Sequence, residues 1–105
     1  MKTTARVIDH LASCDMRYAK APLVAESLGI SGTTLRRRLQ EDGKTFQELL
    51  DAERIRRTQA AMTDNRETRG EHLMKVCGYG EVNSFYRAFA RWHGVNFQDY
   101  RRELI

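Results

Sequence analysis

The stretch from Gly29 to Gly43, GISGTTLRRRLQEDG, places three consecutive arginines between two leucines. Ser31 is a typical N-cap residue, because its hydroxyl can accept a hydrogen bond from a backbone N–H of the first helical turn. The dipeptide Asp42-Gly43 is typical of a turn and would end the helix. The stretch therefore predicts a helix that begins after Ser31 and ends near Glu41.

The two leucines of this helix, Leu35 and Leu39, fall on one side when residues are placed at about 100° per position. The opposite side carries Thr33, Arg37 and Gln40, with Arg36 beside them, and Thr34 and Arg38 lie on a flank. The ten residues from Ser31 to Gln40 contain no acid, so we expect the arginines to lack an i,i+4 partner that would neutralise them. Such a helix has an apolar inner side and an unpaired cationic outer side.

This outer side suits the major groove of DNA. Threonine, arginine and glutamine hydrogen-bond base edges and phosphates, and the arginine fork matches O6 and N7 of guanine. A charged surface facing only water is the alternative. The preceding AESLGIS favours DNA, because Ala25 is small enough to pack between helices, Gly29 allows a sharp turn and Ile30 anchors it. A helix predicted to begin near Ala21, with Pro22 in its first turn, completes a helix-turn-helix.

The rest of the chain also follows the helical period, with a single proline and little alternation of β-branched residues. We expect an all-α protein of about seven helices. We expect a first helix to begin near Thr3 or Thr4, and Thr45 to cap a long helix of about 18 residues and roughly 27 Å. A short helix is predicted from about Glu71 to Cys77 and another from about Glu81 to His93. Asn96 would cap a last helix.

A second unit repeats the first with aromatic residues inside. In GYGEVNSFYRAFARWHG, residues 78–94, the inner stripe is Phe85, Phe89 and Trp92. Asn83, Arg87 and Arg91 lie on the opposite side of that predicted helix. We expect the aromatic residues to be core and the arginines to be exposed. No flexible linker separates the two units, so we expect one compact double unit.

Composition and charge narrow the class of partner. The chain has 105 residues and a formal net charge of +4, which favours a polyanion such as nucleic acid or acidic lipid. The cysteines Cys14 and Cys77 and the histidines His10, His72 and His93 have no metal-ligand spacing, so we expect no metal and no cofactor. No apolar run approaches the ~20 residues of a membrane span, so we expect a cytoplasmic protein with no membrane partner.

The spaced motifs carry a family resemblance. AxxxGIS, TLRRRL and the stretch CGYGEVNSFYRAFARWHGVNFQDYRR resemble the DNA-binding domain of AraC/XylS-type transcription regulators, from about Val7 to Arg102. The resemblance implies two helix-turn-helix units joined by a long helix. We therefore expect a single AraC-type domain over 1–105, with a first unit over 1–43, a connecting helix over 44–63 and a second unit over 64–105.

The resemblance also implies sites and partners. Positions that touch bases are matched by Thr33, Arg36, Arg37, Val82, Asn83 and Arg87. Geometry adds expected contacts to the DNA backbone from Thr34, Gln40, Lys44, Ser84 and Arg91. Such proteins activate transcription by binding double-stranded DNA near a promoter and touching RNA polymerase, so we expect a nucleoid-associated bacterial activator that reads successive major grooves.

Several residues depart from the family pattern. Gly70 and Met74 replace an aliphatic residue and an alanine, so the fifth helix should start poorly and pack differently. Phe97 replaces a proline, and Thr58 replaces an alanine of the connecting helix. Val82 cannot hydrogen-bond a base and at most touches a thymine methyl. Most departures fall in the second unit, so we expect the first unit to supply most sequence discrimination and the second mainly phosphate affinity.

Two other classes of function stay open at this point. The first is a helical protein-interaction module whose basic faces bind acidic partners without reading DNA sequence. The second is a redox switch through Cys14 and Cys77, although cysteines at apolar helical positions are more often core residues. Catalysis has little support, because no nucleophile lies at a suitable spacing from a base.

Overall fold

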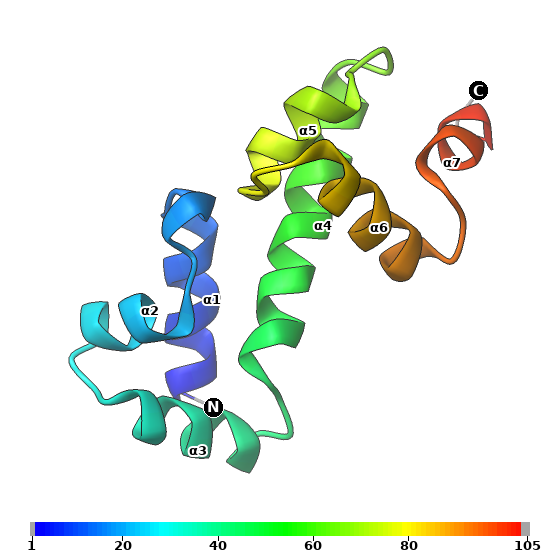
Figure 1. The fold of residues 1–105 in the computed structure, drawn as a ribbon. Coiled ribbons are helices and arrows are strands. Elements are labelled where there is room, and N and C mark those ends of the chain that lie inside the picture. The colour runs from blue at the N-terminus through cyan, green and yellow to red at the C-terminus, as the bar shows by residue number, and fades with distance from the viewer. Residues whose placement is uncertain (1, 104–105) are drawn as a thin grey trace. The chain divides into compact units, whose positions relative to one another are not determined.

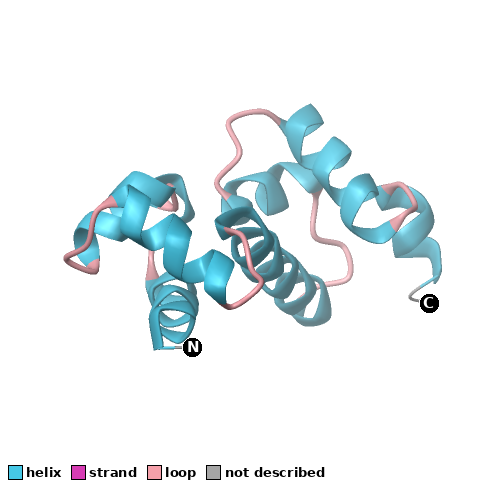
Figure 2. Cartoon of the chain, turned by 90° about the horizontal axis from the view of Figure 1, so that it is seen from below, coloured by secondary structure: helices cyan, strands magenta, loops and turns pink. Residues whose placement is uncertain are grey.

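The computed structural model describes residues 2–103 of the chain. These residues form seven α-helices joined by loops, without a strand, as Figure 1 and Figure 2 show. The helices are α1 (Lys2–Ser13), α2 (Ala21–Ser27), α3 (Gly32–Glu41), α4 (Phe46–Asp64), α5 (Gly70–Cys77), α6 (Val82–His93) and α7 (Phe97–Glu103). The predicted all-α fold is confirmed, with α2–α3 and α5–α6 as the two helix-turn-helix units.

The chain divides into two compact units, unit 1 over residues 1–53 and unit 2 over residues 54–105. The boundary falls inside α4, which therefore contributes to two cores. Leu49 and Leu50 belong to the core of unit 1, and Ala61 and Met62 belong to that of unit 2. The expectation of a single domain over 1–105 remains a prediction.

Unit 1 has an aliphatic core. Its α3 packs against both α1 and α2. Leu35 and Leu39 are 2% and 1% exposed, which confirms the inner side predicted for this helix. Burial of each such side chain stabilises the fold by about 1.5–3 kcal/mol. The core is completed by Val7, Leu11, Met16, Ala19, Val24, Ala25, Leu49 and Leu50.

The turn between α2 and α3 follows the predicted chemistry. Gly29 has φ +73°, a left-handed conformation that side-chain-bearing residues rarely adopt. The Ser31 hydroxyl oxygen accepts a hydrogen bond from the backbone N–H of Thr34 at 3.0 Å, which caps α3. At the next helix, the Thr45 hydroxyl oxygen accepts from the N–H of Glu48 at 3.1 Å and caps α4.

One element of unit 1 was not predicted. Residues Met16–Tyr18 form a short 3-10 helix between α1 and α2. The Asp15 carboxylate accepts a hydrogen bond from the backbone N–H of Arg17 at 2.9 Å and caps it. Met16 is buried, so this segment covers one edge of the aliphatic core.

Unit 2 has an aromatic core. Phe85 and Phe89 are fully buried, as predicted, whereas Trp92 is only partly buried. Phe97 lies among them, with its ring centroid 5.9 Å from that of Phe85 and 5.3 Å from that of Phe89, both in edge-on geometry. Edge-on aromatic pairs add about 0.5–1.5 kcal/mol beyond burial. The residue that departs from the family proline is thus a core residue.

The start of α5 explains a second departure. A Cβ atom built on Gly70 would lie 2.1 Å from the hydroxyl oxygen of Tyr86 and 2.6 Å from its Cζ atom. The ring centroid of Tyr86 is 5.7 Å from those of Phe85 and Phe97, so the ring has little room to move away. The helix begins one residue earlier than predicted and has no side-chain N-cap at Arg69. Gly70 is therefore required by the tyrosine packed against it.

Candidate nucleic-acid interface

The outer side of α3 is accessible in unit 1. Thr33, Arg36, Arg37 and Gln40, which we call the α3 face, are all exposed. They share this side because they are three or four positions apart on a helix whose leucines point inward. The structure therefore brings these four predicted DNA-contacting residues onto one solvent-accessible surface.

One expectation about this face is wrong. Arg37 does have an i,i+4 partner, because its Nε atom lies 3.6 Å from Oε1 of Glu41. The prediction considered residues only as far as Gln40 and missed the acid at the next position. Both side chains of the pair are about two-thirds exposed, at 64% and 66%. Exposed pairs of this kind are weak, so a DNA phosphate or base could replace Glu41 at little cost.

Two of the predicted backbone contacts of unit 1, Thr34 and Lys44, flank this face. Thr34 is partly buried, and its hydroxyl oxygen accepts a hydrogen bond from the Ser31 hydroxyl at 3.0 Å. Its own hydroxyl proton stays available to a phosphate oxygen. Lys44 lies after α3 and is exposed. These groups supply donors at both ends of the face.

The outer side of α6 carries a corresponding set in unit 2. Asn83 and Arg87 are exposed, and Val82 and Ser84 are partly buried. The Nη2 atom of Arg87 donates a hydrogen bond to the Ser84 hydroxyl oxygen at 3.3 Å. Arg91 lies one turn further along and is exposed. We call Asn83, Ser84, Arg87 and Arg91 the α6 face.

The two reading helices differ at their N-termini. The hydroxyl of Ser31 caps α3, whereas Glu81 makes no side-chain hydrogen bond at the start of α6. Backbone N–H groups in the first turn of a helix are donors without helical acceptors and attract anions. The first turn of α6 therefore offers backbone donors beside Asn83 and Ser84, where a DNA phosphate would approach.

The turn of each helix-turn-helix is held by an arginine that lies outside it. Nη2 of Arg6, on α1, donates to the carbonyl oxygen of Leu28 at 3.1 Å, at the end of α2. Nε of Arg54, on α4, donates to the carbonyl oxygen of Cys77 at 3.0 Å, at the end of α5. Leu28 and Cys77 each directly precede the turn glycine of their unit. Sequence reasoning missed both contacts, which join distant positions.

The contact in unit 2 is the more elaborate one. Nη1 of Arg54 also donates to the hydroxyl oxygen of Tyr79 at 3.2 Å, and its Cζ atom lies 4.3 Å from the centroid of that ring. The Thr58 hydroxyl donates to the Arg54 carbonyl at 2.8 Å and lies 3.2 Å from Sγ of Cys77. Thr58 thus joins the network that fixes the second turn.

The cysteine of this network is a core residue. Cys77 is fully buried, and burial raises the pKa of its thiol. A raised pKa disfavours the thiolate, which is the reactive form. Cys14 belongs to unit 1 and is partly buried. The surroundings of Cys77 favour a packing role over a redox role.

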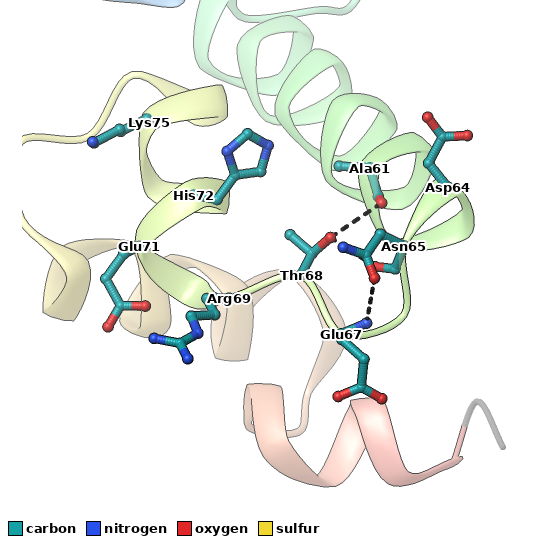
Figure 3. A pocket seen from close by; sticks show the side chains of 9 residues that line it. All are labelled: Ala61, Asp64, Asn65, Glu67, Thr68, Arg69, Glu71, His72 and Lys75. Carbon is teal, nitrogen blue, oxygen red and sulfur yellow. Dashed lines mark hydrogen bonds between the residues drawn. The ribbon is translucent and has the colours of Figure 1, made fainter.

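An open hollow of about 720 Å³ lies in unit 2, where α4 is followed by α5 (Figure 3). The Thr68 hydroxyl donates to the Ala61 carbonyl at 3.4 Å, and the Glu67 N–H donates to Asn65 Oδ1 at 3.0 Å on the loop between the helices. The lining carries both acidic and basic side chains, among them Glu71 and Lys75. The balance of charge gives this hollow no preference for an anion.

Residues 2–103 contain no group of three or more histidine, cysteine, aspartate or glutamate side chains placed to hold a metal ion. Within the same residues, every helix is too short or too polar to span a lipid bilayer.

Comparisons with known proteins agree with this geometry. A family model described as a helix-turn-helix domain matches residues 24–103. The HTH-type transcriptional regulator VqsM of Pseudomonas aeruginosa is 31% identical over 94 residues, which cover 90% of this chain and 29% of that protein. The chain thus spans less than a third of the length of this curated relative.

Two solved structures are similar as well. The transcriptional regulator CdpR from Pseudomonas aeruginosa is 35% identical with a TM-score of 0.86, over 95% of this chain and 31% of that one. A DNA-binding transcriptional dual regulator from Escherichia coli K-12 has a TM-score of 0.85 at 20% identity, over 96% of this chain and 90% of that one. The second likeness shows the fold alone.

Proposed function

The chain belongs to the AraC-type helix-turn-helix family, and from that premise we propose that it binds double-stranded DNA sequence-specifically through α3 and α6. The observation that carries the proposal is the exposure of the α3 face over buried leucines. Helix-turn-helix proteins place such a face in the major groove, where base edges can be read. The two helices would enter successive major grooves.

Base contacts are proposed for three residues of each unit. They are Thr33, Arg36 and Arg37 on α3 and Val82, Asn83 and Arg87 on α6. Arginine donates two hydrogen bonds to guanine, asparagine pairs with adenine, and valine can only contact a thymine methyl. The Ser84 hydroxyl, which accepts from Arg87, would orient the guanidinium toward the base.

Contacts to the DNA backbone are proposed for Thr34, Gln40, Lys44, Ser84 and Arg91. Phosphate contacts position the protein on the duplex and carry no sequence information. The uncapped first turn of α6 supports a phosphate there. We retain the graded version of the proposal, in which unit 1 supplies most of the discrimination and unit 2 mainly affinity.

The role in the cell is proposed from the family resemblance. The protein would act in a bacterial cytoplasm, associated with the nucleoid, and would activate transcription from a promoter through contact with RNA polymerase. The relatives named above are transcriptional regulators of greater length. A transcription assay with purified polymerase would separate activation from repression.

The binding proposal is tested by measuring affinity for duplexes of selected and shuffled sequence at several salt concentrations. For B-DNA, the slope of log K against log salt is about −0.9 for each phosphate neutralised. We expect a steep slope for every duplex and tighter binding to the selected one. Equal affinity for selected and shuffled duplexes with a shallow slope would favour the alternative, a basic protein-interaction module.

A further inference from the structure

Unit 1 contains a hollow of about 370 Å³ beside the α3 face. Its walls come from the start of α2, one side of α3, the turn after α3 and the start of α4. All of its lining residues belong to unit 1: Ala21, Gly32, Leu35, Arg36, Leu39, Gln40, Lys44, Thr45 and Phe46. The volume lies near the lower end of the range of about 300–1,000 Å³ found for small-molecule pockets.

The hollow is amphipathic. Phe46 is partly exposed and, with the edges of Leu35 and Leu39, gives an apolar floor. Arg36 and Lys44 lie in the lining, and both are exposed. No aspartate or glutamate lines the hollow, so its two cations are not balanced within it.

The side chains of Arg36 and Lys44 are also not paired with other groups among the described residues. Among residues 2–103, the side chains of Arg36, Gln40 and Lys44 form no hydrogen bond or ion pair. A cation beside an apolar surface gains most from a ligand that satisfies both features. The chemistry therefore selects a molecule with one anionic group and a small apolar body.

We propose that this hollow binds a small amphipathic carboxylate, with its apolar body against Phe46 and its carboxylate between Arg36 and Lys44. The proposal rests on the proposed function in one respect, since Arg36, Gln40 and Lys44 are also proposed DNA contacts. The carboxylate and DNA would compete for the same donors. Binding of the ligand would therefore release the protein from DNA.

Binding is tested on the 105-residue chain without DNA, with octanoate as the probe and octan-1-ol as its uncharged match. Leucine methyl and phenylalanine signals are followed by NMR. We expect octanoate to shift the signals of Leu35, Leu39 and Phe46 saturably. The double variant Arg36→Gln/Lys44→Gln should weaken binding by about tenfold or more, since it removes two charge-assisted hydrogen bonds.

The matched control is Arg38→Gln, which removes an exposed arginine of the same helix that does not line the hollow. It should bind octanoate as the wild type does. Circular dichroism confirms that each variant is folded. The proposal is overturned if octanoate gives no saturable shift, if octan-1-ol binds equally well, or if Arg38→Gln loses as much affinity as the double variant.

Competition is measured by the anisotropy of a labelled duplex, with acetate at equal concentration as the control for ionic strength. Octanoate should release DNA with a midpoint that follows its directly measured affinity, and acetate should not. A chain that binds octanoate but shows no sequence preference for DNA would contradict the proposed function alone. A chain that binds its DNA site but not octanoate would contradict only the carboxylate site.

Discussion

The two helix-turn-helix units have the same order of helices but different hydrophobic cores. Unit 1 buries α3 with leucines against aliphatic side chains, and unit 2 buries α6 with phenylalanines against Phe97 and Tyr100. The turn in unit 1 is held by the exposed hydrogen bond from Arg6, whereas that in unit 2 is held by the partly buried network around Arg54. The helix-turn-helix fold therefore forms over an aliphatic core as well as over an aromatic one.

This difference changes how the departures from the family pattern are interpreted. Gly70 accommodates Tyr86, Phe97 fills the aromatic core, and Thr58 contacts Cys77. These residues face inward, so they say nothing about whether the outer side of unit 2 reads DNA. The graded hypothesis then depends mainly on Val82, which cannot hydrogen-bond a base.

The largest expected effect tests the aromatic core. Phe89→Ala should destabilise unit 2 by about 3–5 kcal/mol, because it removes a fully buried ring. The chain has one tryptophan, Trp92, which lies in unit 2. Its fluorescence during urea unfolding should report the loss. An unchanged midpoint would show that the ring is not part of the core.

The next effect compares the two arginines that hold the turns. Arg54→Ala should cost about 1.5–3 kcal/mol, because it removes charge-assisted hydrogen bonds that are partly buried. Arg6→Ala should cost less than about 1 kcal/mol, because its hydrogen bond is exposed. Urea unfolding followed by circular dichroism measures both. Equal costs would contradict the difference between a partly buried and an exposed contact.

The glycine at the start of α5 offers a paired test within unit 2. Gly70→Val should cost about 1–3 kcal/mol through overpacking against Tyr86. Tyr86→Ala removes the ring, so the double variant should be more stable than the sum of the two single costs predicts. Urea unfolding of all four proteins completes the cycle. Additive costs would show that the two residues do not compete for the same space.

A comparable effect on DNA binding tests the graded hypothesis. Arg37→Ala should cost about 1–3 kcal/mol and relax preference at one base pair. Arg91→Ala should weaken binding to all sequences alike and reduce the salt slope by about one phosphate contact. A panel of single-base variants of the site measures both. Equal loss of discrimination from Arg37→Ala and Arg87→Ala would overturn the grading.

The smallest effect concerns pH and unit 2. Burial lowers the pKa of His93, whose ring packs 4.4 Å from that of Phe89 and 4.6 Å from that of Tyr100. As the pH falls, His93 of the unfolded chain binds a proton near pH 6.5, whereas His93 of the folded chain binds one only at a lower pH. Stability should therefore be full above about pH 6.5 and fall as the pH drops toward the folded pKa. His93→Gln should flatten this fall in urea midpoints between about pH 7.5 and 5.

Local chemistry made much of the fold predictable. Ser31 and Thr45 cap helices through hydrogen bonds to residues three positions away, and Gly29 has the positive φ that its turn requires. The inner side of α3 followed from helical spacing alone. Asp15 also caps locally, yet its three-residue helix is too short to give a periodic pattern.

Contacts between distant positions could not be predicted. Arg6 and Leu28 are 22 positions apart, and Arg54 and Cys77 are 23 positions apart. The sequence does not indicate which carbonyl oxygen each arginine binds, because arginine can donate to any exposed carbonyl oxygen. Of the candidate site, the exposure of the α3 face and of Asn83, Arg87 and Arg91 on α6 was predictable. The Arg37–Glu41 pair was also predictable from spacing and was missed.

Selection of bound duplexes from a random library, followed by sequencing, tests the central claim that the α3 and α6 faces read base pairs. The wild-type chain should enrich a site with two elements about one helical turn apart, and the element read by unit 1 should be the more strongly selected one. Arg37→Ala should lose preference within one element, and Arg87→Ala should alter only the other. Absence of enrichment, or the same enriched site from all three proteins, would contradict the account.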